Sequence, residues 1–339
     1  MSRKNKAKIR KIKIIVSVSA VFAFVLALII INFFIPVIYF TAYCHLKKDK
    51  NQLNHMRVRF IDAGYGDSVL VELPDGKTLL IDGGTGTYNN VYTLFDVLNS
   101  SGIETIDYLI CTSVKSEHCG ALAEILKYKS VGTAYIPYVS NIYITDEYAA
   151  FYKQLLKSGA RVEIAENGKG INCAEYGYFF GIMSPHVTTY YNCEYNNMNT
   201  NPTAENINNA SAVVWLEFEG RGFMFLSDAG EQVQKDIADQ LLIEQNKIII
   251  EGNSLSLSSC TFLKASNHCA NGYTQPYLYD LIQPEAVIIS VGKNAQSSPS
   301  NTEIANLQLY VNDKIYRTDM HGTVTVTVDS EEYHISKEK

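Results

Sequence analysis

An uncharged, apolar run near the start of the chain constrains the fold most. No charged side chain occurs between Ile14 and Tyr43. A helix of about 20 apolar residues spans the core of a bilayer, and this run is longer, so we expect one transmembrane helix over residues 14–43. A cleaved signal peptide is the rival interpretation. Its apolar region would cover only about 7–15 residues and end at a small-residue cleavage site, whereas this run ends at Tyr43 and Cys44.

The charges around this run predict its orientation. Residues 1–13 contain seven Lys and Arg side chains and no acidic residue. Basic residues stay preferentially on the cytoplasmic side of a membrane. We therefore expect a cytoplasmic tail (1–13), a linker (44–55) and an extracytoplasmic domain (56–330). This organisation predicts a single-pass protein of the cell membrane, anchored in the bilayer.

The part of the chain beyond the tail is acidic. Subtracting the seven tail residues from the 29 Lys and Arg leaves 22 basic side chains against 35 Asp and Glu, a net charge near −13 with histidines neutral. Such a surface repels a phosphate backbone unless a local basic groove overrides it. Strong non-specific nucleic-acid binding is therefore not expected, which leaves an unknown extracytoplasmic ligand or protein partner.

The seven cysteines do not define a disulfide framework. None belongs to a CxxC pair, and the odd number leaves at least one without an intrachain partner. Most are expected to be small buried apolar residues.

Short apolar runs separated by turn residues predict a mixed α/β fold, with two sheets packed together and helices outside. A polar, Asn-rich stretch, Tyr191–Asn209, predicts a long surface loop. The expected helices cover residues 90–99, 121–128 and 231–242, and the expected strands cover 57–62, 68–73, 77–81, 108–111, 134–136, 161–164, 178–183, 212–218, 223–226, 261–263, 286–291, 314–316 and 323–328.

Polar side chains follow several of the expected strands, where sites are commonly built. Oxygen and nitrogen ligands of this kind suit Zn²⁺ or Mn²⁺. Each residue alone is a weak signal, because a strand-end Asp more often caps a turn or helix. The candidate ligands are Glu117, His118, Asp228 and His268, and the other strand-end polar positions are Asp62, Asp67, Asp82, Ser113, Asn267 and Ser298.

Several segments in order carry a resemblance to a known family. FIDAGYGDSVLVELPDGKTLLIDGG is similar to a strand, DVGQGD, a second strand and IDGG. LICTSVKSEHCGAL stands where that family has TH-x-D-x-DH-x-GG, ASAVVWLEFEGRGFMFLSDAG where it has NxxSVV and a strand ending in GD, and FLKASNHCANGY where it has HHGS. Residues 56–330 thus resemble the metallo-β-lactamase-fold domain of ComEC-type competence proteins.

The resemblance implies a fold, a chemistry and a compartment. The fold is an αββα sandwich of the metallo-β-lactamase type, with a metal site at one edge. The chemistry is hydrolysis of esters, amides or phosphodiesters. ComEC-type domains of this kind act outside the membrane on incoming DNA, and the orientation predicted above agrees with that side.

The chain departs from the family pattern at the metal site. Ser113 and Lys115 replace the first His and the following acid of the loop, Glu117-His118 replaces Asp-His, Asp228 keeps the bridging position, Asn267-His268 replaces HH, and Ser298 replaces the last His. The resemblance therefore implies that one of two ion positions is lost. The other would be held by Glu117, His118, Asp228 and His268, with one Zn²⁺ or Mn²⁺ ion or with none. If the protein is active, His118 and Asp228 are the expected catalytic residues. Asp62, Asp67, Asp82, Ser113, Lys115, Asn267 and Ser298 are expected to be degenerate or structural positions.

Lys115 is the most informative of these departures. A protonated ammonium has no lone pair and cannot ligate a cation. Our hypothesis is that Lys115 replaces the charge of the missing ion and pairs with Asp228. The alternative is a Lys115 side chain that extends outward into solvent.

Three functional interpretations remain open. The first is a non-catalytic domain that binds a ligand or partner outside the cell. The second is a one-metal hydrolase of the phosphodiesterase or nuclease type, and the third is a structural or assembly role.

Overall fold

The computed structural model describes residues 53–138, 144–186, 203–293, 295 and 297–339, and residues 53–339 form one compact unit. The predicted tail, the predicted transmembrane helix and most of the predicted linker lie outside the described residues. Within the described residues, no helix is both long enough and apolar enough to cross a bilayer.

In this part of the chain, one eight-stranded sheet has the order β17-β16-β1-β2-β3-β4-β5-β6. Strands β3 to β6 run parallel and the others antiparallel. In β1 buried residues alternate with Arg57 and Arg59, whose guanidinium groups both contact Glu72 on β2. The bounds are β1 Met56–Phe60, β2 Val69–Glu72, β3 Thr78–Ile81, β4 Thr105–Ile110, β5 Ser130–Ile136, β6 Arg161–Ile164, β16 Val324–Val328 and β17 Tyr333–Lys337.

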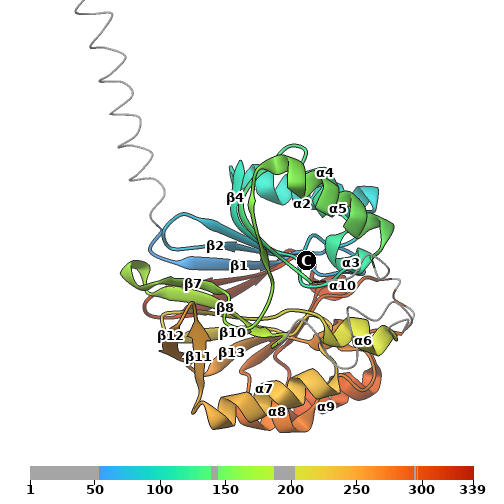
Figure 1. Ribbon diagram of the computed structural model, residues 1–339. Helices are drawn as coiled ribbons and strands as arrows, with labels where there is room; N and C mark the ends of the chain where they lie inside the picture. The colour runs from blue at the N-terminus through green and yellow to red at the C-terminus, as the bar shows by residue number, and fades with distance from the viewer. Residues whose placement is uncertain (1–52, 139–143, 187–202, 294, 296) are drawn as a thin grey trace, which may run out of the picture. The chain divides into compact units, whose positions relative to one another are not determined.

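The second sheet, again counted over the described residues, has seven strands in the order β15-β14-β13-β10-β9-β8-β7. Strands β10, β13, β14 and β15 run parallel. A separate hairpin, β11–β12, lies beside β8 (Figure 1). The bounds are β7 Gly170–Cys173, β8 Tyr178–Ser184, β9 Val213–Phe218, β10 Arg221–Phe225, β11 Lys247–Ile250, β12 Asn253–Ser256, β13 Cys260–Lys264, β14 Ala286–Ile289 and β15 Ile315–Arg317.

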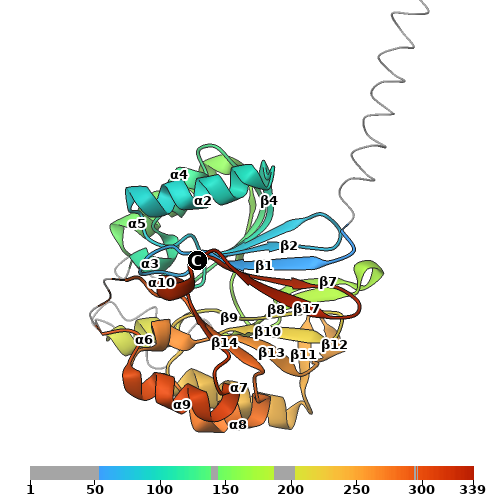
Figure 2. The ribbon, with the colours of Figure 1, turned by 180° about the vertical axis from the view of Figure 1, so that it is seen from behind.

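Helices cover the outer face of each sheet, which gives four layers (Figures 1 and 2). Helices α2, α4 and α5 pack on the first sheet, and α7, α8 and α9 pack on the second. The helices are α2 Tyr88–Ser100, α3 Ser116–Cys119, α4 Leu122–Ile125, α5 Asp146–Ser158, α6 Ala204–Asn209, α7 Glu231–Ile243, α8 Pro276–Ile282, α9 Asn301–Val311 and α10 Thr318–His321, with 3₁₀ turns at Ala174–Tyr176 and Ser266–Cys269.

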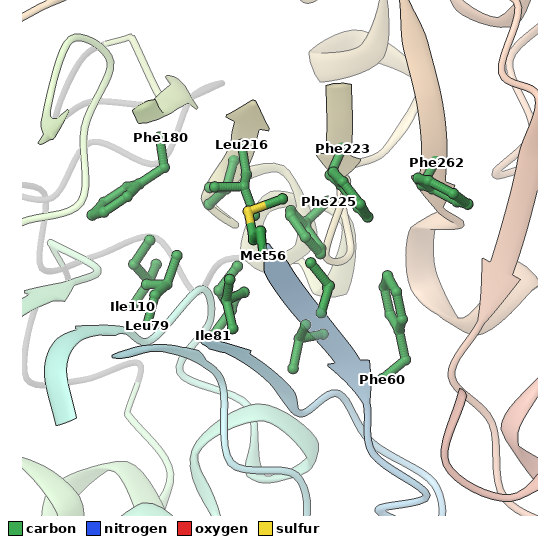
Figure 3. Packing of buried hydrophobic residues seen from close by; sticks show 14 of the residues in the cluster. Met56, Phe60, Leu79, Ile81, Ile110, Phe180, Leu216, Phe223, Phe225 and Phe262 are labelled. Atoms are coloured by element: carbon green, nitrogen blue, oxygen red, sulfur yellow. The ribbon is translucent and has the colours of Figure 1, made fainter. Parts of the chain in front are cut away.

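The largest shared core lies between the two sheets (Figure 3). Phe60 and Ile81 of the first sheet face Phe223, Phe225 and other aromatic residues of the second. Phe223 and Phe262 stack with ring centroids 4.7 Å apart. Burial of each such side chain contributes about 1.5–3 kcal/mol relative to leaving it in water, so this layer holds the two sheets at a fixed spacing.

Several sequence-based boundaries need correction. The domain does not end at residue 330, because β17 pairs with β16 along its whole length. The compact unit begins at Leu53, whose backbone N–H donates to the carbonyl oxygen of Pro74. Residues 53–55, predicted as the end of the linker, therefore belong to this unit. The predicted loop Tyr191–Asn209 ends in helix α6, and its residues before 203 lie outside the described part. The predicted helix over 121–128 is the single turn α4.

Candidate metal centre

The candidate metal centre lies where the parallel strands of both sheets end. β3 and β4 run parallel in the first sheet, as do β10 and β13 in the second. The segments after these four strands carry Asp82, His118, Asp228 and His268. Because the carboxyl ends of parallel strands meet at one sheet edge, residues from distant parts of the sequence converge there.

His118 is the centre of this cluster. Its side chain is fully buried between two carboxylates, with Nδ1 2.8 Å from Oδ2 of Asp82 and Nε2 3.0 Å from Oδ2 of Asp228. Burial opposes protonation, but the charges of Asp228 and Asp82 outweigh it and raise the pKa of His118 well above that of a free histidine. Asp82 is itself fixed by Thr112, whose backbone N–H and hydroxyl both donate to it.

Lys115 points into the cluster rather than into solvent. Its ammonium lies 2.7 Å from Oδ2 of Asp228 and 2.9 Å from Oε1 of Glu117, and only 26% of its side chain is exposed. Burial opposes the charge, yet the two carboxylates raise the pKa of Lys115, which keeps it protonated at neutral pH. Although burial opposes ionisation of Asp228, the charges of His118 and Lys115 lower the pKa of its carboxyl well below the usual range. The predicted ion pair between Lys115 and Asp228 is thus present.

His268 presents a free lone pair to the same place. Its Nδ1 lies 2.8 Å from the carbonyl oxygen of Ser290, which requires a proton on Nδ1. Burial lowers the pKa of His268, so its ring is neutral and Nε2 is unprotonated. Nε2 has no hydrogen-bond partner among the described residues, and neither has Oδ1 of Asp228. The ring of Tyr65 covers His268, with centroids 4.6 Å apart.

Lys264 is a second buried cation that the sequence analysis did not single out. It lies at the end of β13, 2% exposed, and its ammonium binds Oδ2 of Asp67 and approaches the carbonyl oxygen of Ser227 at 3.4 Å. Asp67 lies within 3.4 Å of His268 and 3.8 Å of His118. A lone Lys at the end of an apolar strand, FLK, was the available signal, since charged side chains are almost never fully buried unless paired.

The backbone of the cluster is unusual as well. Asp82, Ser227, Asn267 and His268 all have positive φ, between 41° and 59°. Non-glycine residues rarely adopt this conformation, which costs about 1–3 kcal/mol each and is held by the surrounding structure. Because this strain is concentrated in three loops, we infer that the surrounding structure holds these loops in the conformation that brings their side chains to the cluster.

Comparison with known proteins identifies the family. A profile of the metallo-beta-lactamase superfamily matches residues 61–244, more than half of the chain. The chain belongs to the metallo-beta-lactamase superfamily.

One curated relative of this metallo-beta-lactamase domain is the ComE operon protein 3 of Bacillus subtilis (strain 168). It is 24% identical over 284 residues, which cover 79% of this chain and 32% of that protein. The chain therefore spans about a third of the length of that relative. The match agrees with the competence-protein resemblance found in the sequence.

Solved structures give weaker likenesses. The metallo-beta-lactamase fold protein YhfI from Bacillus subtilis matches 83% of this chain and all of its own, at 8% identity and a TM-score of 0.47. A diphosphatase from the PhnP family matches 84% of this chain and all of its own, at 12% identity and a TM-score of 0.42.

Three of the four predicted metal ligands come together in the metallo-beta-lactamase domain. Donor atoms of His118, Asp228 and His268 lie within 4.8 Å of one another, and all three side chains are buried. Glu117 is not part of this group. Its carboxylate binds Lys115 instead, and this charge lowers its pKa despite the opposing effect of burial.

The remaining predicted positions fall into two sets. Asp67 and Asp82 form a second group with His118. Ser113 and Asn267 lie in the adjoining loops, where the Ser113 hydroxyl accepts from the backbone N–H of Lys115 and the backbone N–H of Asn267 donates to the Ser227 carbonyl, and Ser298 is a buried residue of a third loop. Asp62, predicted as a degenerate or structural position, binds Lys339 at 2.9 Å.

The residues around His268 and Asp228 fit a metal ion. The unpaired Nε2 of His268 and Oδ1 of Asp228 are buried polar atoms without partners in the described part of the chain, and His118 lies beside them. Nδ1 of His268 also donates to the Ser290 carbonyl, as the second ring nitrogen of a metal-bound imidazole usually does. In the other group, Oδ2 of Asp67 is paired with Lys264, while its Oδ1 is also buried without a hydrogen-bond partner among the described residues. Beside both groups, the Lys115 ammonium pairs with Asp228 and Glu117, and an ammonium cannot coordinate a cation.

Proposed function

We propose that this chain is a membrane-anchored, extracytoplasmic relative of the ComEC-type hydrolase domain in which two-metal catalysis is lost and the domain acts by binding a ligand or protein partner. Membership of the metallo-beta-lactamase superfamily and the relationship to the ComE operon protein 3 support the hydrolase-like ancestry. The basic tail and the apolar run of residues 14–43 support the anchor and its orientation.

The position of the Lys115 ammonium carries this proposal. Two-metal hydrolysis uses ions about 3.5–4 Å apart, which share ligands and stabilise the attacking and leaving oxygens. Here the ammonium is bound 2.7 Å from the Asp228 carboxylate. At an effective dielectric of about 20, two unit positive charges about 4 Å apart repel by about 4 kcal/mol, and a divalent ion about doubles this. Lys115 and a second ion therefore compete for the same carboxylate.

A one-metal hydrolase is the second candidate, and the unpaired atoms of His268 and Asp228 favour it. His118, Asp228 and His268 would hold one Zn²⁺ or Mn²⁺ ion, with the ion taking the place of the proton on Nε2 of His118. When bound, such an ion supplies a Lewis acid that acidifies a water molecule. The protein's own part would be to hold the ligands, with the Ser290 carbonyl fixing the His268 tautomer and Asp82 fixing His118.

A hydrolysis assay distinguishes the two candidates. The full chain would be given an activated phosphodiester and, separately, linear DNA, each with Zn²⁺ or Mn²⁺, beside the Asp228→Asn variant. We expect the wild-type rate to equal that of the variant, because no two-ion site forms. Metal-dependent turnover by the wild type that Asp228→Asn abolishes would favour the hydrolase instead. Circular dichroism of both proteins shows whether the variant is folded.

A further inference from the structure

A second candidate binding site lies on the outer helical layer, away from the metal centre. Helices α2 and α4 lie side by side above the first sheet in both ribbon views (Figures 1 and 2). Between them and the start of β5 is a groove of about 910 Å³. Small-ligand sites have volumes of about 300–1,000 Å³. None of the candidate metal ligands lines the groove.

The walls of this groove present aromatic faces to solvent. Tyr88 and Tyr128 line it and are 82% and 66% exposed, and Tyr92, one turn after Tyr88, is 62% exposed. The rings of Tyr88 and Tyr92 lie nearly parallel, 21° apart, at a centroid distance of 6.5 Å. Phe95 continues the same helical face and meets Tyr128 edge to face at 5.5 Å. The result is an apolar, ring-lined surface that the described part of the chain leaves open.

Part of the groove lining is the backbone of two loops. Gly86 and Gly120 line it, and a Cβ on Gly120 would lie 2.2 Å from the backbone nitrogen of Gly86. Two loops therefore touch directly, and any side chain at Gly120 would push them apart.

The charged residues at the groove cancel one another. Glu104 lies 3.1 Å from the Lys129 ammonium, and Glu124 is paired with Lys127. An anionic ligand would meet these carboxylates, and the excess of 35 acidic over 29 basic residues in the chain opposes it further. A cationic ligand would have to displace a lysine. The balance therefore favours a neutral ligand with many hydroxyl groups, which can bond to paired carboxylates and to the Asn99 amide.

We propose that this groove binds a neutral oligosaccharide. The C–H faces of sugar rings can cover the exposed tyrosine rings and remove apolar surface from water, while the hydroxyls bond to Glu124 and Asn99. Single-stranded nucleic acid could stack on the same rings, but its phosphates would lie against Glu104 and Glu124. The inference does not depend on the state of the metal centre.

Calorimetric titration with defined sugars tests the proposal. The full chain would be kept in a detergent whose headgroup contains no sugar and titrated with chitotetraose and with cellotetraose. We expect saturable binding of at least one of them. Tyr88→Ala and Tyr128→Ala should each weaken it about tenfold or more, as expected for the loss of a stacking ring. Tyr152→Ala, which removes a 41% exposed tyrosine of α5 outside the groove, should leave binding unchanged.

Three outcomes would overturn the proposal. The first is the absence of saturable binding with both sugars, and the second is binding that Tyr88→Ala and Tyr128→Ala leave intact. The third is a concentration-dependent dimer in sedimentation that Tyr88→Ala abolishes, which would assign the groove to a second copy of the chain. Equal thermal melting of all variants ensures that a lost signal reports binding and not unfolding.

Discussion

At the residue scale, Lys115 determines what the candidate metal centre can hold. Its ammonium links Asp228, which has no exposed surface, to Glu117. The Glu117 carboxylate, which the sequence predicted as a ligand, is turned toward this charge instead. The sequence could predict that Lys115 cannot ligate a metal, but its direction depended on the two facing carboxylates, one of which is 113 residues away.

Replacing Lys115 should destabilise the fold. We expect Lys115→Met to lower the free energy of unfolding by about 2–4 kcal/mol, because it leaves the buried Asp228 carboxylate with one cation fewer. This value is below that for breaking a fully buried ion pair, because solvent screens the partly exposed lysine. The measurement is urea denaturation with a chelator present, so that no metal replaces the lost charge.

Lys127→Met is the matched control for this change. Lys127 also pairs with a glutamate, but its side chain is 51% exposed. Its replacement should leave the free energy of unfolding close to that of the wild type, because an exposed ion pair contributes little. Equal values for the two variants would mean that the Lys115 pair is no stronger than a surface pair.

At the element scale, the predictable parts were those with strong periodicity. The strands β1 to β3 and helix α7 lie within two residues of their predicted bounds. Helices α5, α8 and α9 and the hairpin β11–β12 were missed, although Tyr148, Phe151 and Leu155 of α5 are buried at helical spacing. In α9 one of the three buried residues is Glu303, which accepts hydrogen bonds from Gly272 and Thr274 and which a hydrophobic pattern cannot reveal.

Helix α5 should depend on a single capping residue. The Thr145 hydroxyl accepts from the backbone of Tyr148 and donates to the carbonyl of Val114 at 2.7 Å, which ties the helix to the loop of Lys115. We expect Thr145→Ala to cost about 1–2 kcal/mol of unfolding free energy in urea denaturation, since it removes a cap and a second hydrogen bond.

Thr203→Ala is the comparison for this cap. Thr203 begins the short helix α6 with a capping box, and its side-chain hydrogen bonds stay within the first turn of that helix. Its replacement should cost about 1 kcal/mol or less. A loss as large as that of Thr145→Ala would show that the bond to Val114 contributes nothing.

At the scale of the whole molecule, the order of the segments along the sequence predicted which strands meet at the site. It did not predict every pair of side chains that meets there. The segments resembling the ComEC-type domain placed β3, β4, β10 and β13 in order, and their ends bring His118, Asp228 and His268 together. The sequence did not reveal the buried Lys264–Asp67 pair, because the two residues are 197 positions apart and meet only when the sheets pack. The anchor over residues 14–43 remains a prediction from composition and charge.

The stoichiometry of bound metal tests the central claim most directly. The full chain would be incubated with Zn²⁺ or Mn²⁺, desalted and analysed for metal per chain, beside Asp228→Asn as the variant that removes the shared carboxylate. We predict at most one ion per chain, lost in Asp228→Asn, because Lys115 occupies the position of the other. Two ions per wild-type chain, both absent from Asp228→Asn, would contradict this account.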